Sequence, residues 1–252
     1  MSNGQAGKAA VAKVFNDWYA DIHAQASVKL DGPDPMTLSK YGPFASVFEK
    51  GELTVPGYLE LLNLNGPGAG IVIDRVQLAL ATEEPRRWIE ALFDGPNWRG
   101  HLVGAVAILL DGGARLDTVA LWRTLDCGSW VSPQLVVTAY FADPSFQEHL
   151  MERISPRCQV TVPSALSPVE RRSATGPGGT VHRSAKLLVS LLSMGKRLPA
   201  LSAFLQQASA DPDLAALLEK DAENAADITE SWCAQVIAHF AARHHVLIPR
   251  AL

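Results

Sequence analysis

Two short motifs combine residue types and spacings that could support chemistry. Ser193-Met-Gly-Lys196 places a hydroxyl three residues before an amine, the spacing of serine acyl-transfer enzymes. Those enzymes also carry Ser-Asp-Asn and Lys-Thr-Gly motifs, and neither occurs in this sequence. Ser-x-x-Lys alone recurs by chance, so this motif does not predict an acyl-transfer site.

The second motif is a glycine-rich stretch, Gly66-Pro-Gly68-Ala-Gly70, which follows an apolar run and precedes an expected helix. This is the context of a phosphate-binding loop. The dinucleotide-binding pattern requires another glycine where Ile71 stands, and no Gly-Lys-Ser/Thr sequence is present. We therefore interpret the stretch as a plain turn.

The histidines and cysteines show no metal-binding spacing, because neither His-x-x-x-His nor Cys-x-x-Cys occurs. His244-His245 ends an expected helix, where a histidine interacts favourably with the helix dipole. Cysteines 127, 158 and 233 lie far apart and are odd in number, which argues against a disulfide framework. We predict no metal and no cofactor.

Several carboxylates could act as general acids or bases. Glu83-Glu84, Asp94 and Asp126 each lie at an expected helix boundary, where capping of backbone N–H groups is the simpler role. No Lys, Arg or His is adjacent to Cys127 to favour its thiolate. The sequence therefore predicts no catalytic residue. An enzyme whose site is assembled from scattered polar residues stays open as an alternative.

Apolar residues recur every three or four positions along much of the chain, which predicts amphipathic helices. The expected helices are residues 6–26, 37–48, 71–81, 86–93, 102–110, 135–141, 187–194, 199–208, 213–221 and 225–243. Residues 51–64 are ambiguous between strand and helix. Predicted helical structure therefore dominates.

A repeat lies in the middle of the chain. Asp94 and Trp98 recur as Asp126 and Trp130, at one constant offset. Ile89 with Leu121, Phe93 with Leu125, and Ala107 with Ala139 share this offset. Helix, turn, helix and breaker form the unit, and residues 187–211 follow the same order loosely. We predict that Trp98 and Trp130 occupy equivalent positions and pack into the core between repeats.

This pattern resembles HEAT-like α-helical repeats over about half of the chain. The resemblance implies a curved stack of helices that binds a partner, and it transfers no catalytic residue. The expected fold is mainly all-α, with antiparallel helix pairs stacked as a HEAT-like solenoid and one long irregular Pro/Gly-rich insertion. Residues 1–154 would form a helical N-terminal part with the two repeats, and residues 185–252 a helical C-terminal part of the same domain.

Composition narrows the functional classes. Hydrophobic residues make up 48% and charged residues 19%, which excludes global disorder. The net charge is −4, so no basic excess indicates nucleic acid or an anionic membrane. No run approaches the roughly 18 apolar residues of a membrane helix, and the first residues lack a secretory signal. We expect a cytoplasmic protein.

The predicted function is a non-enzymatic protein-binding module, such as a bacterial immunity or adaptor protein. Arg86, Arg87, Arg99 and Arg123 are the predicted partner contacts, because they flank the matched repeats and arginine near tryptophan is typical of binding hot spots. The enzyme is the alternative. HEAT-like nucleic-acid binding, through Arg86-Arg87-Trp88 and Trp98-Arg99, is the third reading. The partner itself is not identified by the sequence.

Residues 155–184 contain four prolines and Gly176-Pro-Gly-Gly, and no apolar periodicity, so the sequence predicts an exposed insertion or linker. Brief trypsin treatment should cut first at Arg171, Arg172 or Arg183, and the two fragments should stay associated. Mass spectrometry of the fragments checks this. First cleavage between Arg86 and Arg123 would contradict the predicted organisation.

Overall fold

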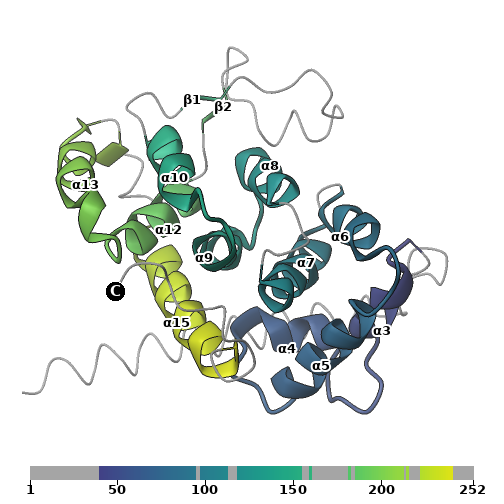
Figure 1. Ribbon diagram of the computed structural model, residues 1–252. Coiled ribbons are helices and arrows are strands. Elements are labelled where there is room, and N and C mark those ends of the chain that lie inside the picture. Colours follow the sequence, from purple (N-terminus) through teal and green to yellow (C-terminus); the bar gives the residue numbers. More distant parts are fainter. Residues whose placement is uncertain are drawn as a thin grey trace, which may run out of the picture. The chain divides into compact units, whose positions relative to one another are not determined.

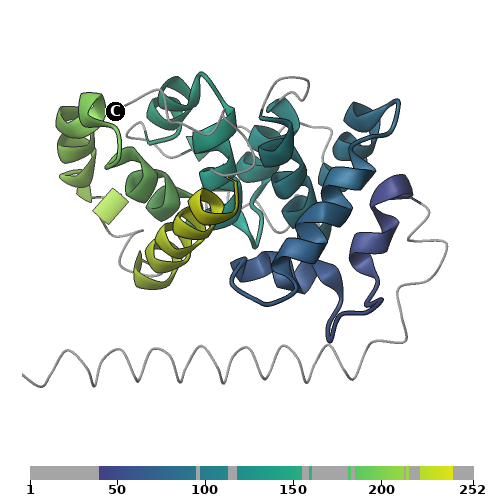
Figure 2. The same cartoon turned by 60° about the horizontal axis from the view of Figure 1, so that its bottom comes forward.

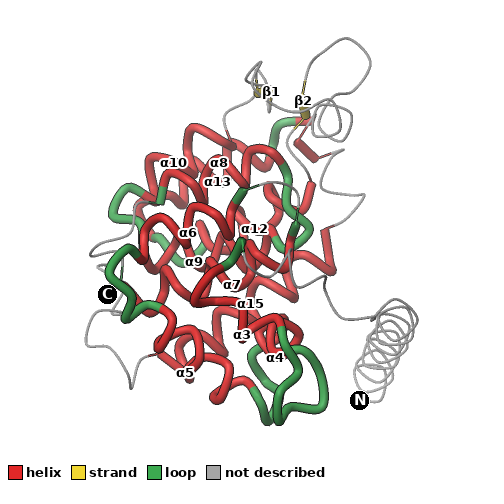
Figure 3. The backbone as a smooth tube through the Cα atoms, turned by 90° about the vertical axis from the view of Figure 1, so that its right-hand side faces the viewer, coloured by secondary structure: helices red, strands yellow, loops and turns green. Residues whose placement is uncertain are grey.

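The computed structural model describes residues 40–94, 97–112, 118–154, 159–160, 181–182, 185–212, 214–215 and 222–240. The chain divides into two compact units, Met1–Lys40 and Tyr41–Leu252, and the elements below belong to the second. The described residues are mostly helical, which confirms the predicted all-α class (Figure 3). The predicted helix at residues 6–26, most of the 155–184 insertion and His244-His245 lie outside the described residues.

Nine helices of the described residues lie in three layers (Figure 1). The outer layer contains α6 (Pro85–Phe93), α8 (Val119–Cys127) and α10 (Phe146–Ile154). The middle layer contains α7 (Trp98–Asp111), α9 (Ser132–Ala142) and α12 (Ala185–Gly195). The third layer contains α4 (Gly57–Asn63), α5 (Ala69–Ala79) and α15 (Ala222–Phe240). Each outer helix packs mainly on one middle helix, and α9 packs between α7 and α12.

The middle helices are apolar around nearly their whole circumference because they are covered on both sides. Gly100 to Leu110 of α7 are all buried, and so are Leu187 to Gly195 of α12. Two buried hydroxyls of this layer bond to their own helix: Thr138 donates to the Gln134 carbonyl (3.0 Å), and Ser190 donates to the Lys186 carbonyl (2.7 Å). The layer therefore forms the core.

Shorter elements flank the layers. The 3-10 turn η1 (Gly42–Phe44) and α3 (Ala45–Phe48) pack near α4 and α5, while η2 (Pro199–Leu201) leads into α13 (Ser202–Ser209). Strands β1 (Gln159–Val160) and β2 (Val181–His182) form one antiparallel pair, with Gln159 opposite His182. In Figure 2, α15 (yellow) comes forward between α12 and α4, both of which it contacts.

Helix α12 is apolar enough to raise the question of a membrane. No single helix of the described residues is long and apolar enough to span one. One pair, Ala185–Gly195 with Pro199–Ser209, meets the length and composition criteria together, across a bend of 117°.

The structure resolves or revises several predicted elements. Residues 51–64, ambiguous in the sequence, contain the helix α4, and the predicted helix at 86–93 is α6. The helix predicted at 37–48 is shorter, because within its described residues only η1 and α3 are helical. Within the predicted insertion, residues 159–160 form the short strand β1.

The pairs that match at the constant sequence offset share their environment: Ile89 and Leu121 are buried, and so are Phe93 and Leu125. The helix boundaries follow a different offset. Helices α6 and α8 begin at residues 85 and 119, and α7 and α9 at residues 98 and 132. The first residues of α6 and α8 are therefore as far apart in sequence as those of α7 and α9. This separation exceeds the separation of the matched buried residues by about half a helical turn. Buried positions therefore keep the sequence offset while the helix starts shift.

The C-terminus of α4 is bonded by side chains from distant parts of the chain. A helix leaves its last four carbonyls without partners inside the helix. Here the Trp232 indole N–H donates to the Leu61 carbonyl (3.1 Å), and the Gln134 amide donates to the Leu62 carbonyl (3.1 Å). Leu64, which follows the last helical residue, is fully buried, has φ of 55°, and accepts a 2.7 Å hydrogen bond from His239 Nε2. These contacts bind α4 to α9 and α15.

The glycine-rich loop before α5 is a turn, as predicted, and it encloses a carboxylate of the same chain. The Gly68 N–H donates to Glu60 Oε2 (3.2 Å), and Glu60 is 9% exposed. A Cβ atom at residue 66 would lie 2.1 Å from the same oxygen. A side chain at 66 would therefore have to displace the Glu60 carboxylate, which occupies the place where a bound anion would lie.

Replacing Gly66 with alanine should destabilise the protein by about 1–3 kcal/mol, because the new methyl overlaps the Glu60 carboxylate. Gly70→Ala is the matched control: nothing lies within 4 Å of its added Cβ, and alanine favours the helix by up to about 1 kcal/mol. Urea unfolding of both variants measures the difference. Equal stability of the two variants would contradict the enclosed carboxylate.

Candidate functional site

The carboxylates expected to cap helices have other roles. Glu84 makes no side-chain cap hydrogen bond and instead pairs with Arg87 (3.5 Å). Asp94 follows the last residue of α6 and is exposed. Asp126 lies in the last turn of α8 and pairs with Arg153. The capping prediction was therefore wrong for these three residues. Asn97 provides a side-chain cap instead, accepting from the Arg99 N–H (3.2 Å).

Asp126 and Arg153 form a two-bond ion pair that joins α8 to α10. Arg153 Nε and Nη2 donate to the two Asp126 oxygens at 2.9 and 2.6 Å. The guanidinium also lies 4.3 Å from the Trp122 ring centroid, and the Arg153 side chain is only 9% exposed. A bidentate pair of this kind fixes the relative orientation of the two side chains. Asp126 therefore has a structural role, which is to hold α8 against α10.

Asp143 and His149 form the one carboxylate–imidazole pair of the described residues. His149 Nδ1 donates to Asp143 Oδ2 at 2.7 Å, and the same oxygen accepts from the Trp122 indole at 2.6 Å. Such a pair orients a histidine in nucleophilic enzymes. Within the described part of the chain, however, no hydroxyl or thiol hydrogen-bonds to this imidazole. The pair was not predicted from the sequence, although its two residues lie close together at the start of a helix.

The Ser193-x-x-Lys196 motif does not form a serine–lysine pair. The Ser193 hydroxyl donates to Glu230 Oε1 at 2.5 Å, Arg197 also bonds to Glu230, and Lys196 is exposed. Burial opposes ionisation of Glu230, but the hydrogen bonds from Ser193 and Arg197 outweigh it and lower the pKa of this carboxyl. Nearby, burial raises the pKa of the Cys233 thiol. The cluster therefore holds a carboxylate rather than an activated nucleophile.

A continuous line of aromatic rings runs from the interior to the surface. Tyr41 stacks on Phe48 (centroids 4.4 Å apart), Phe48 lies 6.1 Å from Tyr58, and Tyr58 meets Trp98 edge-on at 5.8 Å. Trp98 in turn lies 4.9 Å from Trp130. The first three residues are buried, whereas Trp130 is 39% exposed. The line places a supported indole at the surface.

Two cations lie on the outer rings. The Arg99 guanidinium is 4.8 Å from the Trp98 centroid and 5.5 Å from that of Tyr58. The Lys186 amine is 5.5 Å from the Trp130 centroid. Cation and ring attract one another at these separations. We call Trp98, Arg99, Trp130 and Lys186 the Trp98–Trp130 edge.

The loop that carries Trp130 is fixed to the core by the preceding serine. Ser129 is 7% exposed, and its hydroxyl lies 2.9 Å from His101 Nδ1 of α7. Its carbonyl accepts the Ser132 hydroxyl at 2.6 Å. Gly128 has φ of +84°, a conformation that residues with a side chain rarely adopt. Gly-Ser-Trp therefore turns the chain, anchors it, and leaves the indole at the surface.

The edge lies at one end of the middle layer. Trp98 begins α7, Trp130 comes just before α9, and Lys186 is the second residue of α12. Their mutual contacts place the three helix N-termini side by side. Trp98 and Trp130 thus lie at the same end of neighbouring middle-layer helices, but not at the equivalent positions predicted, because Trp98 is the first residue of α7 whereas Trp130 precedes Ser132, the first residue of α9. The prediction that both pack into the core was also wrong.

The four predicted arginines are not brought together. Arg86 and Arg87 lie in the first turn of α6 and pair with Glu90 (3.2 Å) and Glu84 (3.5 Å). Arg99 lies beyond the other end of α6, on the Trp98–Trp130 edge, and Arg123 is exposed on α8. The sequence indicated Arg99 but gave no indication of Lys186, whose approach to Trp130 depends on tertiary packing.

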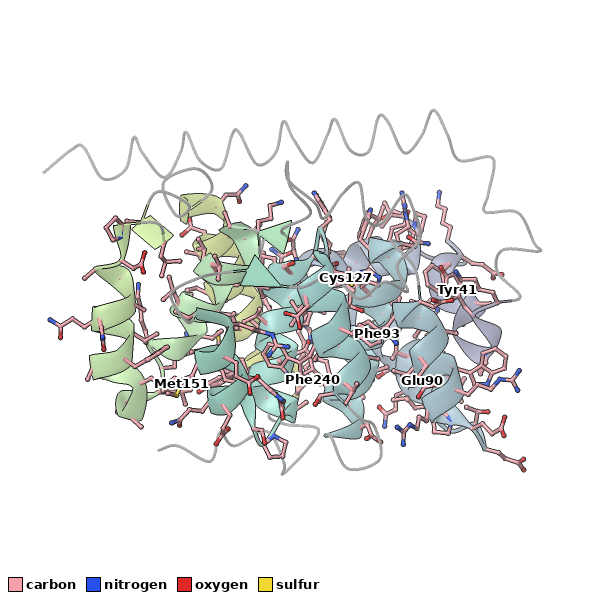
Figure 4. All side chains as sticks on the ribbon, turned by 90° about the horizontal axis from the view of Figure 1, so that it is seen from above. Tyr41, Glu90, Phe93, Cys127, Met151 and Phe240 are labelled. Carbon is pink, nitrogen blue, oxygen red and sulfur yellow. The ribbon has the colours of Figure 1, made fainter. Side chains whose placement is uncertain are left out.

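Among the described residues, no group of three His, Cys, Asp or Glu side chains is placed to hold a metal ion. Cys127 closes α8, and Figure 4 labels it together with Phe93, the last residue of α6. The Trp98–Trp130 edge is therefore the feature with the most specific surface chemistry in this part of the chain.

No protein-family model matches the sequence, and neither a curated protein nor a solved structure matches the chain. The geometry of the chain itself therefore carries any inference about its function.

Trp98→Ala, Trp130→Ala and the double variant should show a coupling free energy of about 0.5–1.5 kcal/mol, because the two indoles contact one another. Trp130→Ala alone should cost less than the about 3–5 kcal/mol of a fully buried aromatic residue, since its ring is partly exposed. Chemical unfolding of the four proteins measures both quantities. Strictly additive losses would contradict the contact.

Proposed function

We propose that this chain is a non-enzymatic protein-binding module built from HEAT-like stacked helix pairs, and that it acts in the cytoplasm as an adaptor or immunity protein. The observation that carries the proposal is the Trp98–Trp130 edge. It presents a partly exposed indole, held by a buried aromatic line and flanked by two cations. Tryptophan and arginine are among the residues most enriched at binding hot spots.

The packing of the helices supports a binding surface that does not rearrange. The middle layer is buried along its length, and Ser129 fixes the loop that carries Trp130. A surface ordered before binding loses little conformational freedom when a partner arrives. The two described cysteines, Cys127 and Cys233, are thiols rather than a disulfide, in keeping with a reducing compartment.

One observation favours the enzyme alternative. The Asp143–His149 pair has the 2.7 Å contact of an oriented general base, and the His149 side chain is 34% exposed. Asp143 also accepts from Trp122 and from the Ser145 N–H (2.9 Å), however, so the carboxylate already joins α8 to the start of α10. We therefore rank catalysis below partner binding.

The proposal predicts a stable complex in the native host. Tagged full-length chain, purified from that host under native conditions, should elute from gel filtration with a second protein in a fixed ratio. Trp130→Ala should reduce that protein by about tenfold, because loss of a central aromatic contact typically costs more than about 1 kcal/mol. Val119→Ala is the matched control, since Val119 is an exposed apolar residue (65%) on α8.

Elution of the chain alone, together with saturable turnover in a metabolite screen that His149→Ala abolishes, would replace partner binding with the enzyme alternative. If the Trp130 and Val119 variants lose the bound protein equally, the Trp98–Trp130 edge is not the binding surface.

A further inference from the structure

We propose that the Trp98–Trp130 edge binds an acidic segment of a partner protein, in which an aromatic or aliphatic side chain stands beside aspartate or glutamate. This inference rests on the proposed function and adds the chemistry of the partner.

The first support is that Arg99 differs from most described arginines in its ion pairing. Five of the seven described arginines are paired with a carboxylate of the same chain, namely Arg75, Arg86, Arg87, Arg153 and Arg197. Arg99 contacts the rings of Trp98 and Tyr58, and no described residue supplies it with a carboxylate. Among the described residues, Arg99 therefore carries a charge that no carboxylate neutralises.

Lys186 is in the same situation next to Trp130. Its amine contacts the Trp130 ring, and the described residues include no carboxylate paired with it. The indole pair thus carries a guanidinium next to Trp98 and an ammonium next to Trp130. A ligand that places an apolar group on the rings brings any neighbouring carboxylate close to a cation, and such a contact is stronger than an equivalent one between neutral groups.

The N-terminal ends of the helices add positive partial charge to that of the two cations, but they do not define the site by themselves. The N-termini of α7 and α9 and the first turn of α12 meet at the edge, and each helix N-terminus carries a partial positive charge. These partial charges and the two cations favour an acidic ligand at the edge, although the whole chain carries a net charge of −4.

The same features count against a nucleic acid. Binding to a phosphate backbone depends on several neutralised phosphates, and the edge offers two cations from the described residues. Aromatic stacking would serve a base as well as a side chain, so the number of cations separates the two ligands. An acidic protein segment needs one or two charge contacts beside an apolar anchor, which the edge supplies.

Peptide display against the full-length chain provides the probe. Selected peptides should be enriched in Asp and Glu next to Trp, Phe or Leu. A synthetic copy should bind the wild-type chain, and a copy with Asn and Gln in place of the acids should bind at least about tenfold more weakly. Binding of the acidic copy should also weaken as salt is raised, because exposed charges are screened.

Charge reversal locates the peptide. Arg99→Glu with Lys186→Glu should weaken binding of the acidic peptide by at least about tenfold, whereas Arg86→Glu with Arg87→Glu, at the far end of α6, should leave it within about twofold. Melting temperatures confirm that each variant is folded. In nitrogen-15 spectra, the indole signals of Trp98 and Trp130 should shift on titration, while that of Trp232, bonded to Leu61, should not.

Peptides without acid enrichment, or an acidic peptide that the edge variants still bind, would overturn the inference. Stronger binding of an oligothymidylate at the edge would identify the edge as a nucleic-acid site. Self-association that is lost in Trp130→Ala would identify it as a contact with a second copy of the chain. Either result would also overturn the inference. A host complex that persists in the Arg99/Lys186 variant would contradict this inference but not the proposed function. Acid-selective peptide binding without any host complex would contradict the proposed function instead.

Discussion

The carbonyl groups at the end of α4 constrain the whole helical unit. They are buried, and a buried carbonyl without a partner costs free energy comparable to a lost hydrogen bond. Their partners are Gln134 on α9 and Trp232 and His239 on α15, all far from α4 along the chain. These bonds hold α4, α9 and α15 in one relative arrangement, so the packing of the N-terminal part of the unit depends on its C-terminal helix.

This constraint reaches the proposed binding surface through the middle layer. Gln134 lies in the first turn of α9, shortly after Trp130, and bonds to α4, whose Tyr58 supports Trp98 from behind. The edge is therefore built from α7, from the start of α9 and from α12, whose positions are all fixed by contacts in the core. Aromatic residues held in this way bind without first being ordered, which favours affinity.

The sequence predicted those features that depend on local periodicity. The all-α class, the helix at 86–93 and the shared burial of Ile89 and Leu121 follow from apolar spacing. A short apolar run such as residues 58–64 fits a strand equally well, so α4 was not predictable. Arg153 and Lys186 each meet their partner from a helix far along the chain, and no local pattern encodes either contact. The same limit applies to Trp130, whose exposure is decided by the anchoring of Ser129 to His101.

Hydrogen exchange at the Trp232 indole tests most directly whether the end of α4 holds the unit together. Its N–H donates to Leu61 in the fully packed interior, where Trp232 is 1% exposed. The account predicts that this proton exchanges only through global unfolding, with an exchange free energy equal to the free energy of unfolding from denaturant titration and with the same denaturant dependence. A smaller free energy that does not respond to denaturant would mean that α15 opens locally, and would contradict the claim that these hydrogen bonds fix the middle layer.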